Sequence, residues 1–297
     1  MTNANIAVLG SANMDLIARL PRPPRIGETV FGSDFTTVPG GKGLNQAVAA
    51  SRAGANVAFA GAVGEDGHGE VLKALLASEG IDTGAVRTVH APTGVALINV
   101  FDSGDNAIVV CSGANAELHD LDERAREAIE RAAYLVMQFE LRPSLLLEAA
   151  RFARSHGVRT VLTPAPVIDH DPELLELTDL LVLNAGEATH LTGIEDPGQA
   201  AIRLSHRAGA VIATLGEHGS VLARDGALAD RIPARKANAV DTTAAGDTYV
   251  GVLTARLGAG DDLPEAMRWA TTAAAIAVTR PGATTSMPMR PEIEAAL

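Results

Sequence analysis

The stretch Asp241-Thr242-Thr243-Ala244-Ala245-Gly246-Asp247-Thr248 joins a run of small residues to an acidic residue, and a helix-like pattern follows over residues 249–257. The first N–H groups of a helix have no partner within the helix, so they attract anions. A carboxylate at Asp247 can take a proton from a hydroxyl while the preceding N–H groups hold a developing phosphoryl charge. The stretch therefore indicates phosphoryl transfer to an alcohol, although it also fits an ordinary helix start with an acidic residue.

A second glycine-rich turn enters a helical pattern at Gly40-Gly41-Lys42-Gly43-Leu44-Asn45-Gln46-Ala47. Glycine lets the backbone approach a ligand closely, Lys42 offers a cation to a hydroxyl or phosphate group, and Asn45 lies one helical step inside. The spacing matches neither a Walker A loop nor a dinucleotide-binding fingerprint. Taken alone, the stretch also fits a flexible turn that leads into an amphipathic helix ending near Gly54.

Asn13 and Asp15 follow a short buried strand that we expect over residues 6–9. Open α/β sheets bind their ligands at the carboxyl ends of such strands. A carboxylate accepts hydrogen bonds from neighbouring sugar hydroxyls, and an amide both donates and accepts, so the pair suits a polyol. The same two residue types are also favoured in an ordinary turn after a strand.

Strand-like and helical runs alternate along the rest of the chain. The 297 residues allow one large domain or two small ones, and 47% hydrophobic with only 3% aromatic residues favours helices packed on a parallel sheet. The expected strands are 57–61, 134–138, 160–163, 180–183 and 211–215, and the expected helices are 68–78, 121–132, 143–156 and 263–278. We therefore predict a single α/β domain over residues 1–297 with a doubly wound, mostly parallel sheet flanked by helices.

Two segments break this alternation. Residues 28–38 and 94–110 are rich in Val, Ile, Thr and Phe and alternate imperfectly, which is typical of a hairpin and an extra strand. We predict a small inserted β-sheet lid, built from about residues 14–40 and 93–111, over the mouth of the main domain. Because the bare outer face of a small sheet is a liability, we expect a homodimer in which two lids pack together.

The charge balance excludes several classes of partner. The net charge is −12 and no basic run stands out, which argues against binding to nucleic acid or to an anionic membrane. The single cysteine, Cys111, fits a reducing cytoplasm, and we expect it to be a small core residue on a strand. Residues 1–5 lack a charged segment followed by a long apolar stretch, so we expect no signal peptide and no membrane span.

The two glycine-containing stretches together resemble the ribokinase branch of the PfkB carbohydrate-kinase family. The resemblance extends from Gly10-Ser11-Ala12-Asn13-Met14-Asp15 to Ala277-Val278-Thr279-Arg280-Pro281-Gly282-Ala283-Thr284-Thr285-Ser286. Several motifs in the same order are more specific than any single one. The resemblance implies a ribokinase-like fold, with Asp247 as the catalytic base and the amides of Ala244, Ala245 and Gly246 as an anion hole.

The resemblance also implies binding residues. The sugar site would comprise Asn13, Asp15, Gly40, Gly41, Lys42, Asn45, Glu140 and Asp247. The ATP site would comprise Asn184, Glu187, Thr214, Gly216, Gly219 and Gly246. Of these, Glu140 fits a solvated loop acid equally well, and Asn184 with Glu187 fits both magnesium and phosphate positioning and a simple helix cap.

A potassium site is implied by the family match alone. It would consist of the Asp241 carboxylate, the Ser286 hydroxyl and the carbonyls of Thr243, Ala277, Arg280 and Gly282. Hard oxygen ligands of this kind suit potassium, which would steady the loop that carries the anion hole.

Together with the resemblance, these residues lead us to expect ATP-dependent phosphorylation of D-ribose at O5, with magnesium and potassium. Other sugars, namely deoxyribose, fructose or a keto-deoxy sugar acid, and nucleosides remain alternatives, although the chain has few aromatic residues with which to hold a nucleoside base. A catalytically silent sugar sensor is an alternative of another class, and the presence of Asp247, Asn184 and Glu187 argues against it. The residues that contact adenine are not indicated by the sequence.

Overall fold

The computed structural model describes residues 5–297. The expectation that residues 1–5 contain no signal peptide therefore falls almost entirely outside the described residues. No helix within residues 5–297 is long and apolar enough to cross a membrane.

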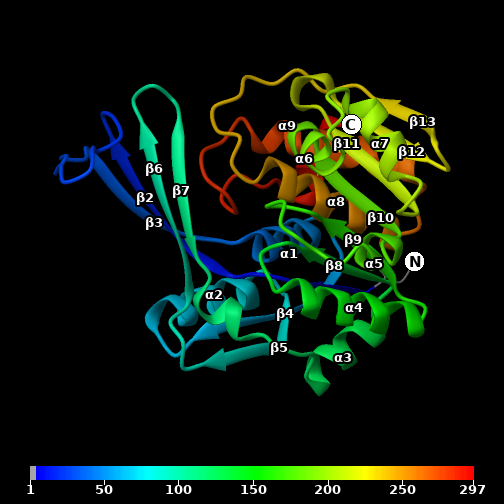
Figure 1. The fold of residues 1–297 in the computed structure, drawn as a ribbon, viewed down its shortest axis with the longest axis horizontal. Coiled ribbons are helices and arrows are strands. Elements are labelled where there is room, and N and C mark those ends of the chain that lie inside the picture. Colours follow the sequence, from blue (N-terminus) through cyan, green and yellow to red (C-terminus); the bar gives the residue numbers. More distant parts are fainter. Residues whose placement is uncertain (1–4) are drawn as a thin grey trace.

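A nine-stranded sheet forms the centre of the main domain (Figure 1). Its strands, in spatial order, are β13 (Ala227–Ile232), β12 (Ser220–Arg224), β11 (Ala210–Thr214), β10 (Leu180–Asn184), β9 (Arg159–Thr163), β8 (Tyr134–Gln138), β1 (Asn5–Leu9), β4 (Asn56–Gly64) and β5 (Asp82–Val89). All neighbours from β11 to β5 are parallel, and β12 and β13 continue the sheet in antiparallel fashion. The mostly parallel sheet expected from the sequence is confirmed.

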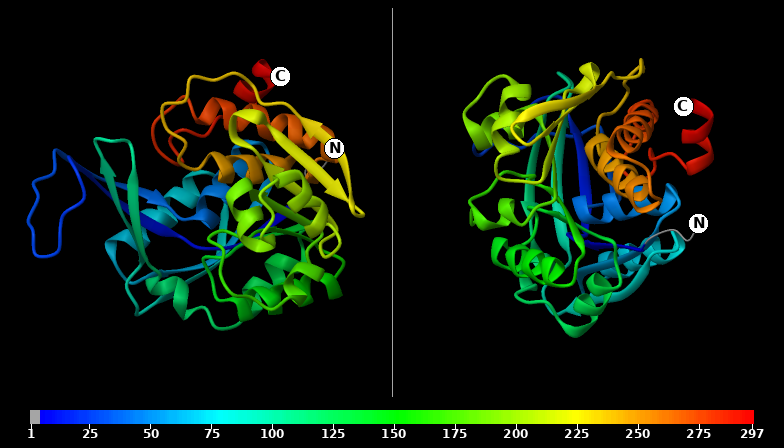
Figure 2. Two further views of the ribbon diagram at one scale, coloured as in Figure 1. Left: turned by 45° about the horizontal axis from the view of Figure 1, so that its top comes forward. Right: turned by 90° about the vertical axis from the view of Figure 1, so that its right-hand side faces the viewer.

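Helices cover both faces of this sheet, as the turned views show (Figure 2). One face packs against α1 (Lys42–Arg52), α2 (Gly67–Ser78), α8 (Ala245–Gly258), α9 (Leu263–Ala277) and α10 (Arg290–Ala296). The other face packs against α3 (Glu123–Glu130), α4 (Pro143–Ser155), α5 (Glu173–Glu176), α6 (Ala185–Thr192) and α7 (Pro197–Leu204). Two separate apolar cores result, one on each face, which is the layering of a doubly wound fold.

A separate four-stranded sheet projects from the main domain (Figure 1). It is formed, in spatial order, by β3 (Asp34–Gly40), β2 (Asn13–Leu20), β6 (Gly94–Phe101) and β7 (Asn106–Cys111). We call this sheet the lid. The strand predicted over residues 28–38 begins only at Asp34, because residues 25–33 form an exposed loop with only a short turn of its own.

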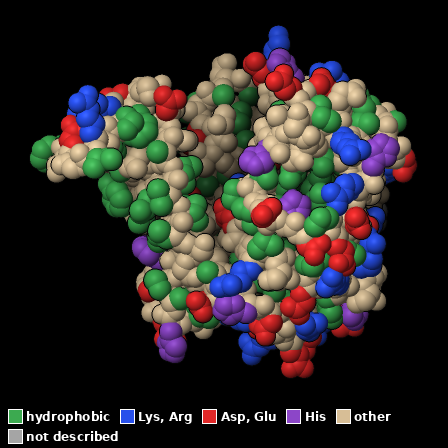
Figure 3. Space-filling view, in the orientation of Figure 1, with side chains coloured by type: hydrophobic (Ala, Val, Ile, Leu, Met, Phe, Trp, Pro, Cys, Tyr) green, Lys and Arg blue, Asp and Glu red, His purple; other side chains and the backbone are tan. Residues whose placement is uncertain are grey.

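The lid leaves apolar side chains uncovered (Figure 3). Leu97 and Val109 are paired across β6 and β7, and 41% and 55% of their surfaces are exposed. Cys111, at the end of β7, is also exposed, so the expectation that it lies in the core was wrong. The reason is that β7 is an edge strand of a sheet that carries no helical layer on this side, and a strand residue is buried only when something covers its face.

The topology gathers distant segments at one edge of the main sheet. The parallel strands β1, β8, β10 and β11 all end there. Helix α1 begins after β3, and α8 packs against α1 so closely that a Cβ at Gly251 would lie 2.5 Å from the Gln46 carbonyl oxygen. Only a glycine permits this approach, and it brings residues about 200 positions apart in the chain into contact.

Candidate active site

The start of α8 has the geometry of an anion-binding helix terminus. Ala244 lies in the left-handed region with φ = 57°, and its carbonyl accepts hydrogen bonds from the Thr248 N–H at 2.8 Å and hydroxyl at 2.9 Å. The N–H groups of Gly246 and Asp247 come before this first helical hydrogen bond, so the helix supplies them with no partner. The Ala245 N–H instead faces the Thr242 carbonyl at 3.3 Å. Of the predicted anion-hole donors, Gly246 is the most open to an incoming ligand.

Two amide side chains from α1 hold the carboxylate of Asp247, which is 7% exposed. Asn45 Nδ2 donates to Oδ2 at 3.1 Å, and Gln46 Nε2 donates to Oδ1 at 2.9 Å. Both oxygens therefore carry a fixed donor and keep further lone pairs for a hydroxyl. Asn45 Oδ1 is buried without a hydrogen-bond partner in the described chain, which leaves an acceptor beside Asp247 for a ligand to use.

The glycine-rich turn lies directly on the segment that follows β1. Gly41 has φ = 93°, and a Cβ there would lie 2.8 Å from the Asn13 amide nitrogen. A Cβ at Gly43 would lie 2.6 Å from the Cα of Gly10. The glycines are thus required for backbone contact between residues 10–13 and 40–43, and the alternative of a merely flexible turn is not supported.

Four ionisable residues predicted for the sugar site lie within electrostatic reach of one another. Burial, followed by the carboxylates of Glu140 and Asp247, raises the pKa of Asp15 to about 7. The Asp247 carboxylate contributes most to raising the pKa of the half-buried Lys42 ammonium. Gly40 packs directly against this cluster. A side chain would not fit there, because a Cβ would lie 2.2 Å from Asp15 Oδ2. One cation therefore lies among three carboxylates in a strongly polar cluster.

Glu140 is not the solvated loop acid that the sequence left open. The carboxylate oxygen Oε2 accepts hydrogen bonds from the Ser11 hydroxyl and, at 3.1 Å, from the Lys42 backbone N–H. Glu140 therefore ties the end of β8 to both the β1 segment and the glycine-rich turn. This positions the turn, whatever further contact Glu140 makes with a ligand.

Asn115 is a site residue that sequence reasoning missed. It lies in the 3₁₀ helix Gly113–Glu117, is 1% exposed, and donates from Nδ2 to Asn13 Oδ1 at 2.8 Å. Its own Oδ1 accepts the Ala12 N–H at 3.1 Å, so Asn115 fixes both the position and the amide orientation of Asn13. No periodicity or spacing indicated it, since Ala12 and Asn13 lie about 100 residues away in the chain.

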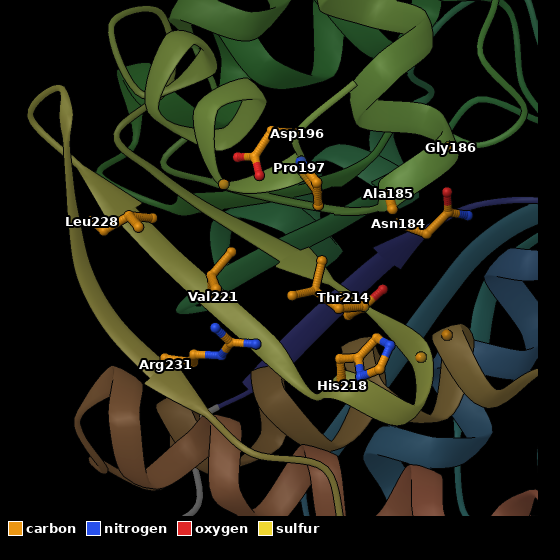
Figure 4. Close-up of a pocket in the computed structure, with 14 residues that line it drawn as sticks. Asn184, Ala185, Gly186, Asp196, Pro197, Thr214, His218, Val221, Leu228 and Arg231 are labelled. Carbon is orange, nitrogen blue, oxygen red and sulfur yellow. The ribbon is translucent and has the colours of Figure 1, made fainter. Parts of the chain in front are cut away.

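A cleft of about 700 Å³ opens beside the start of α8 (Figure 4). Four of the residues predicted to bind ATP line it: Asn184, Thr214, Gly216 and Gly246. Further lining residues, which the sequence did not indicate, include Asp196, Pro197, Val221, Leu228 and Arg231. The cleft is large enough for a nucleotide, and Gly246 places one end of it next to Asp247.

Glu187 and Gly219, also predicted to bind ATP, do not line this cleft. Glu187 Oε2 accepts the Asn184 N–H at 2.9 Å, and Asn184 Oδ1 accepts the Glu187 N–H at 2.8 Å, so the two residues form a capping box on α6. Burial is the main cause that raises the pKa of Glu187, with Lys42 and Asp247 both near enough to influence it. Gly219 directly precedes β12 and packs against the end of β13, where a Cβ would lie 2.0 Å from the Ile232 carbonyl oxygen.

Asp241 joins the loop before α8 to the segment after α9. Its Oδ1 accepts the Thr243 N–H at 2.9 Å and its Oδ2 accepts the Gly282 N–H at 2.8 Å. Burial acts to raise the pKa of Asp241, but hydrogen bonds from the Thr243 side chain and from the Gly282 and Thr243 N–H groups outweigh it, so the pKa is lowered. Ser286 is fully buried and donates to the Ala283 carbonyl at 2.8 Å, which leaves its oxygen free to accept. The Ala277 carbonyl accepts the Arg280 N–H at 3.0 Å.

Comparisons with known proteins identify the family to which the chain belongs. The model of the pfkB family of carbohydrate kinases matches residues 3–290. The chain is 41% identical to the ribokinase of Haemophilus influenzae over 295 residues, covering 97% of this chain and 96% of that protein. It is 37% identical to the ribokinase of Bacillus subtilis over 292 residues, covering 98% of each.

A solved structure has the same fold. The structure of Arabidopsis thaliana ribokinase complexed with ribose and ATP superimposes with a TM-score of 0.93 at 30% sequence identity, covering 99% of both chains. The fold, the order of the motifs and the family match all cover nearly the whole chain. The chain therefore belongs to the pfkB family of carbohydrate kinases.

Proposed function

We propose that this protein is an ATP-dependent ribokinase that transfers the γ-phosphoryl group of ATP to O5 of D-ribose. The observation that carries the proposal is the position of Asp247. Asp247 lies in the first turn of α8, and its carboxylate belongs to the polar cluster suited to a sugar. The N-terminus of the same helix opens onto a nucleotide-sized cleft. Relatives named ribokinase and the ribose- and ATP-bound neighbour support the choice of substrates.

The reaction follows from this arrangement. Asp247 takes the proton of the O5 hydroxyl as the oxygen attacks the γ-phosphorus, and the bond from that phosphorus to the β,γ-bridging oxygen breaks to release ADP. The Gly246 and Asp247 N–H groups hold the charge that develops on the phosphoryl oxygens. Asn13 and Asp15 orient the sugar by accepting hydrogen bonds from its hydroxyl groups, and Lys42 offsets the negative charge of the surrounding carboxylates.

Magnesium suits the residues near the cleft. Glu187 uses one carboxylate oxygen in the capping box, so its other oxygen remains for a water of a hydrated magnesium ion. When bound, magnesium neutralises phosphate charge and orients the triphosphate. Asn184 and Glu187, fixed by the capping box, would hold it from the protein side.

Potassium suits the oxygen atoms around Asp241, and a variant there tests it. We expect potassium chloride to raise the turnover of the unaltered enzyme, and we expect Asp241→Asn to remove this response, because the site loses its one formal charge while one side-chain oxygen remains for the loop. Turnover is measured against potassium chloride, with choline chloride as the ionic-strength control. A variant that keeps the full potassium response would contradict the assignment.

The lids are proposed to join two chains in a homodimer, since their apolar side chains are otherwise left in water. We expect the mass measured by light scattering to be that of a dimer and Val109→Glu to give a monomer. Val71→Glu is the matched control: Val71 lies on α2 and is 48% exposed, close to the 55% of Val109. A wild-type mass that equals one chain at every concentration would exclude the dimer.

The function is tested by measuring conversion of ATP to ADP with magnesium and potassium across ribose, deoxyribose, fructose and adenosine. We expect the highest kcat/KM with ribose. Faster turnover with another acceptor would be consistent with the proposed mechanism but would contradict ribose as the preferred substrate. Sugar binding without turnover of any acceptor would favour a sensor instead.

A further inference from the structure

We propose that Gln46 and Gln138 form a relay that holds the Asp247 carboxylate in the orientation required for proton abstraction, which makes both glutamines positioning residues. The inference rests on the proposed function for the role of Asp247, and it extends that function to residues that touch neither the sugar nor ATP in the arrangement described above.

The relay consists of two hydrogen bonds in series. Gln138 Nε2, at the end of β8, donates to Gln46 Oε1 at 2.7 Å, and Gln46 Nε2 donates to Asp247 Oδ1 at 2.9 Å. An ionised carboxylate only accepts hydrogen bonds, so Gln46 must turn its Nε2 toward Asp247. The Oε1 atom of Gln46 then faces Gln138, which in turn must donate. The direction of both amides is therefore set by the charge on Asp247.

The relay places an unpaired polar atom in the buried core, which lowers the stability of the fold. This argues that the two glutamines have a role other than stability. Both glutamines are completely buried, and Gln138 Oε1 has no hydrogen-bond partner within residues 5–297. Gly10 leaves the space for this atom, because a Cβ there would lie 2.3 Å from it. An unpaired buried carbonyl is destabilising, and two apolar side chains of similar shape would avoid it.

Without Gln138, Gln46 Oε1 loses its buried donor, and the Gln46 side chain is no longer held in one position beside Asp247. The carboxylate can then shift with Gln46 away from the O5 hydroxyl. A misplaced Asp247 carboxylate lowers the rate of the chemical step. Sugar binding depends instead on Asn13, Asp15 and the glycine-rich turn. The relay should therefore act on kcat and leave KM for ribose nearly unchanged.

The test compares Gln138→Met and Gln46→Met, which keep side-chain volume, in the full-length enzyme. We expect kcat to fall about tenfold for Gln138→Met, as for the loss of one hydrogen bond, and about 100-fold for Gln46→Met, as for a misplaced reacting group. KM for ribose should change less than about threefold by the same argument. In an Asp247→Asn background, neither substitution should lower kcat further, because the relay acts only through the carboxylate.

Two contrasting variants complete the design. Thr254→Val alters another fully buried polar side chain on α8, whose hydroxyl donates to the Val250 carbonyl at 2.8 Å, and it should leave kcat and KM unchanged. Asn115→Leu alters a buried amide that acts on the sugar site, so it should raise KM for ribose more than it lowers kcat.

The relay is overturned if Gln138→Met keeps the wild-type kcat, or if the kcat losses are the same size in the Asp247→Asn background. The comparison uses whichever sugar the wild-type enzyme phosphorylates fastest. Failure of the wild-type enzyme to prefer ribose would therefore count against the proposed substrate and not against the relay.

Discussion

Replacing Asp247 with Asn is expected to lower kcat for ribose phosphorylation about 10²- to 10⁴-fold, which is the usual contribution of a general base. Asparagine is nearly isosteric but cannot take the proton of the O5 hydroxyl. It also presents an N–H₂ group where Asn45 and Gln46 both donate, so one of these hydrogen bonds is replaced by a repulsive contact. The loss should therefore appear in kcat, because the groups that bind ribose and ATP remain.

The measurement is steady-state turnover with ribose and ATP varied separately, together with ribose binding by calorimetry. Unchanged ribose affinity with a collapsed kcat would assign Asp247 to the chemical step. A kcat within about tenfold of wild type, in a variant that still binds ribose, would remove Asp247 from the role of base, because a general base contributes at least 10²-fold. If the Asp247→Asn protein binds sugar and retains the physiological effect of the wild-type protein in the cell, the result would favour the alternative of a catalytically silent sugar sensor.

Replacing Asp15 with Asn is expected to stabilise the sugar-free protein at neutral pH while weakening ribose binding. The carboxyl group of Asp15 is buried near Glu140 and Asp247, with Lys42 as the nearby cation, and its pKa is raised to about 7. The folded state therefore binds the Asp15 proton more tightly than the unfolded state does. Ionising Asp15 in the folded protein costs stability, and asparagine does not incur this cost.

The sign of the pH dependence follows from the two pKa values. The stability that protonated Asp15 contributes is complete below its ordinary pKa of 3.8 and is lost as the pH rises through about 7. The melting temperature of Asp15→Asn relative to wild type should therefore increase between pH 4 and pH 7 and level off above. Calorimetric scans across this range measure it, and a difference that does not vary with pH would contradict the raised pKa.

The same substitution should raise KM for ribose about 10- to 100-fold at pH 8, the cost of one hydrogen bond to a charged group. Asparagine keeps one acceptor oxygen but no charge. Wild-type KM should itself rise as the pH falls below about 7, since protonation removes the same acceptor, whereas KM of Asp15→Asn should be independent of pH there. Equal KM values for the two proteins at pH 8 would exclude Asp15 from the sugar site.

Much of the fold was predictable because its signals are local. The strands β8, β9 and β10 are short continuous apolar runs, and α4 begins at Pro143 and ends before Gly157, so composition and helix boundaries place them within a residue or two. The lid strands were predicted where apolar and polar residues alternate and the regular order of strands and helices is interrupted. Cys111 was misplaced because a strand pattern does not say whether its face is covered.

The candidate site likewise contains residues that the sequence indicated and residues that it did not. Asp247, the glycine-rich turn and the Asn184–Glu187 pair were indicated by residue type and spacing near a helix start, and by the order of the family motifs. Asn115, Gln46 and Gln138 gave no signal of their role, since an amide side chain has no periodicity and its partners in the site lie 92 to 201 residues away.

The sequence by itself determined the alternation of strands and helices, the family, and the residue types available for phosphoryl transfer, because propensity, capping and motif order act over short stretches. Only the tertiary structure decided which of these residues meet. The contact of α1 with α8 at Gly251 brings Gln46 to Asp247, and burial among other carboxylates moves the pKa of Asp15. Both effects depend on distances between segments far apart in the chain, and those distances are set by the packing of helices on the sheet.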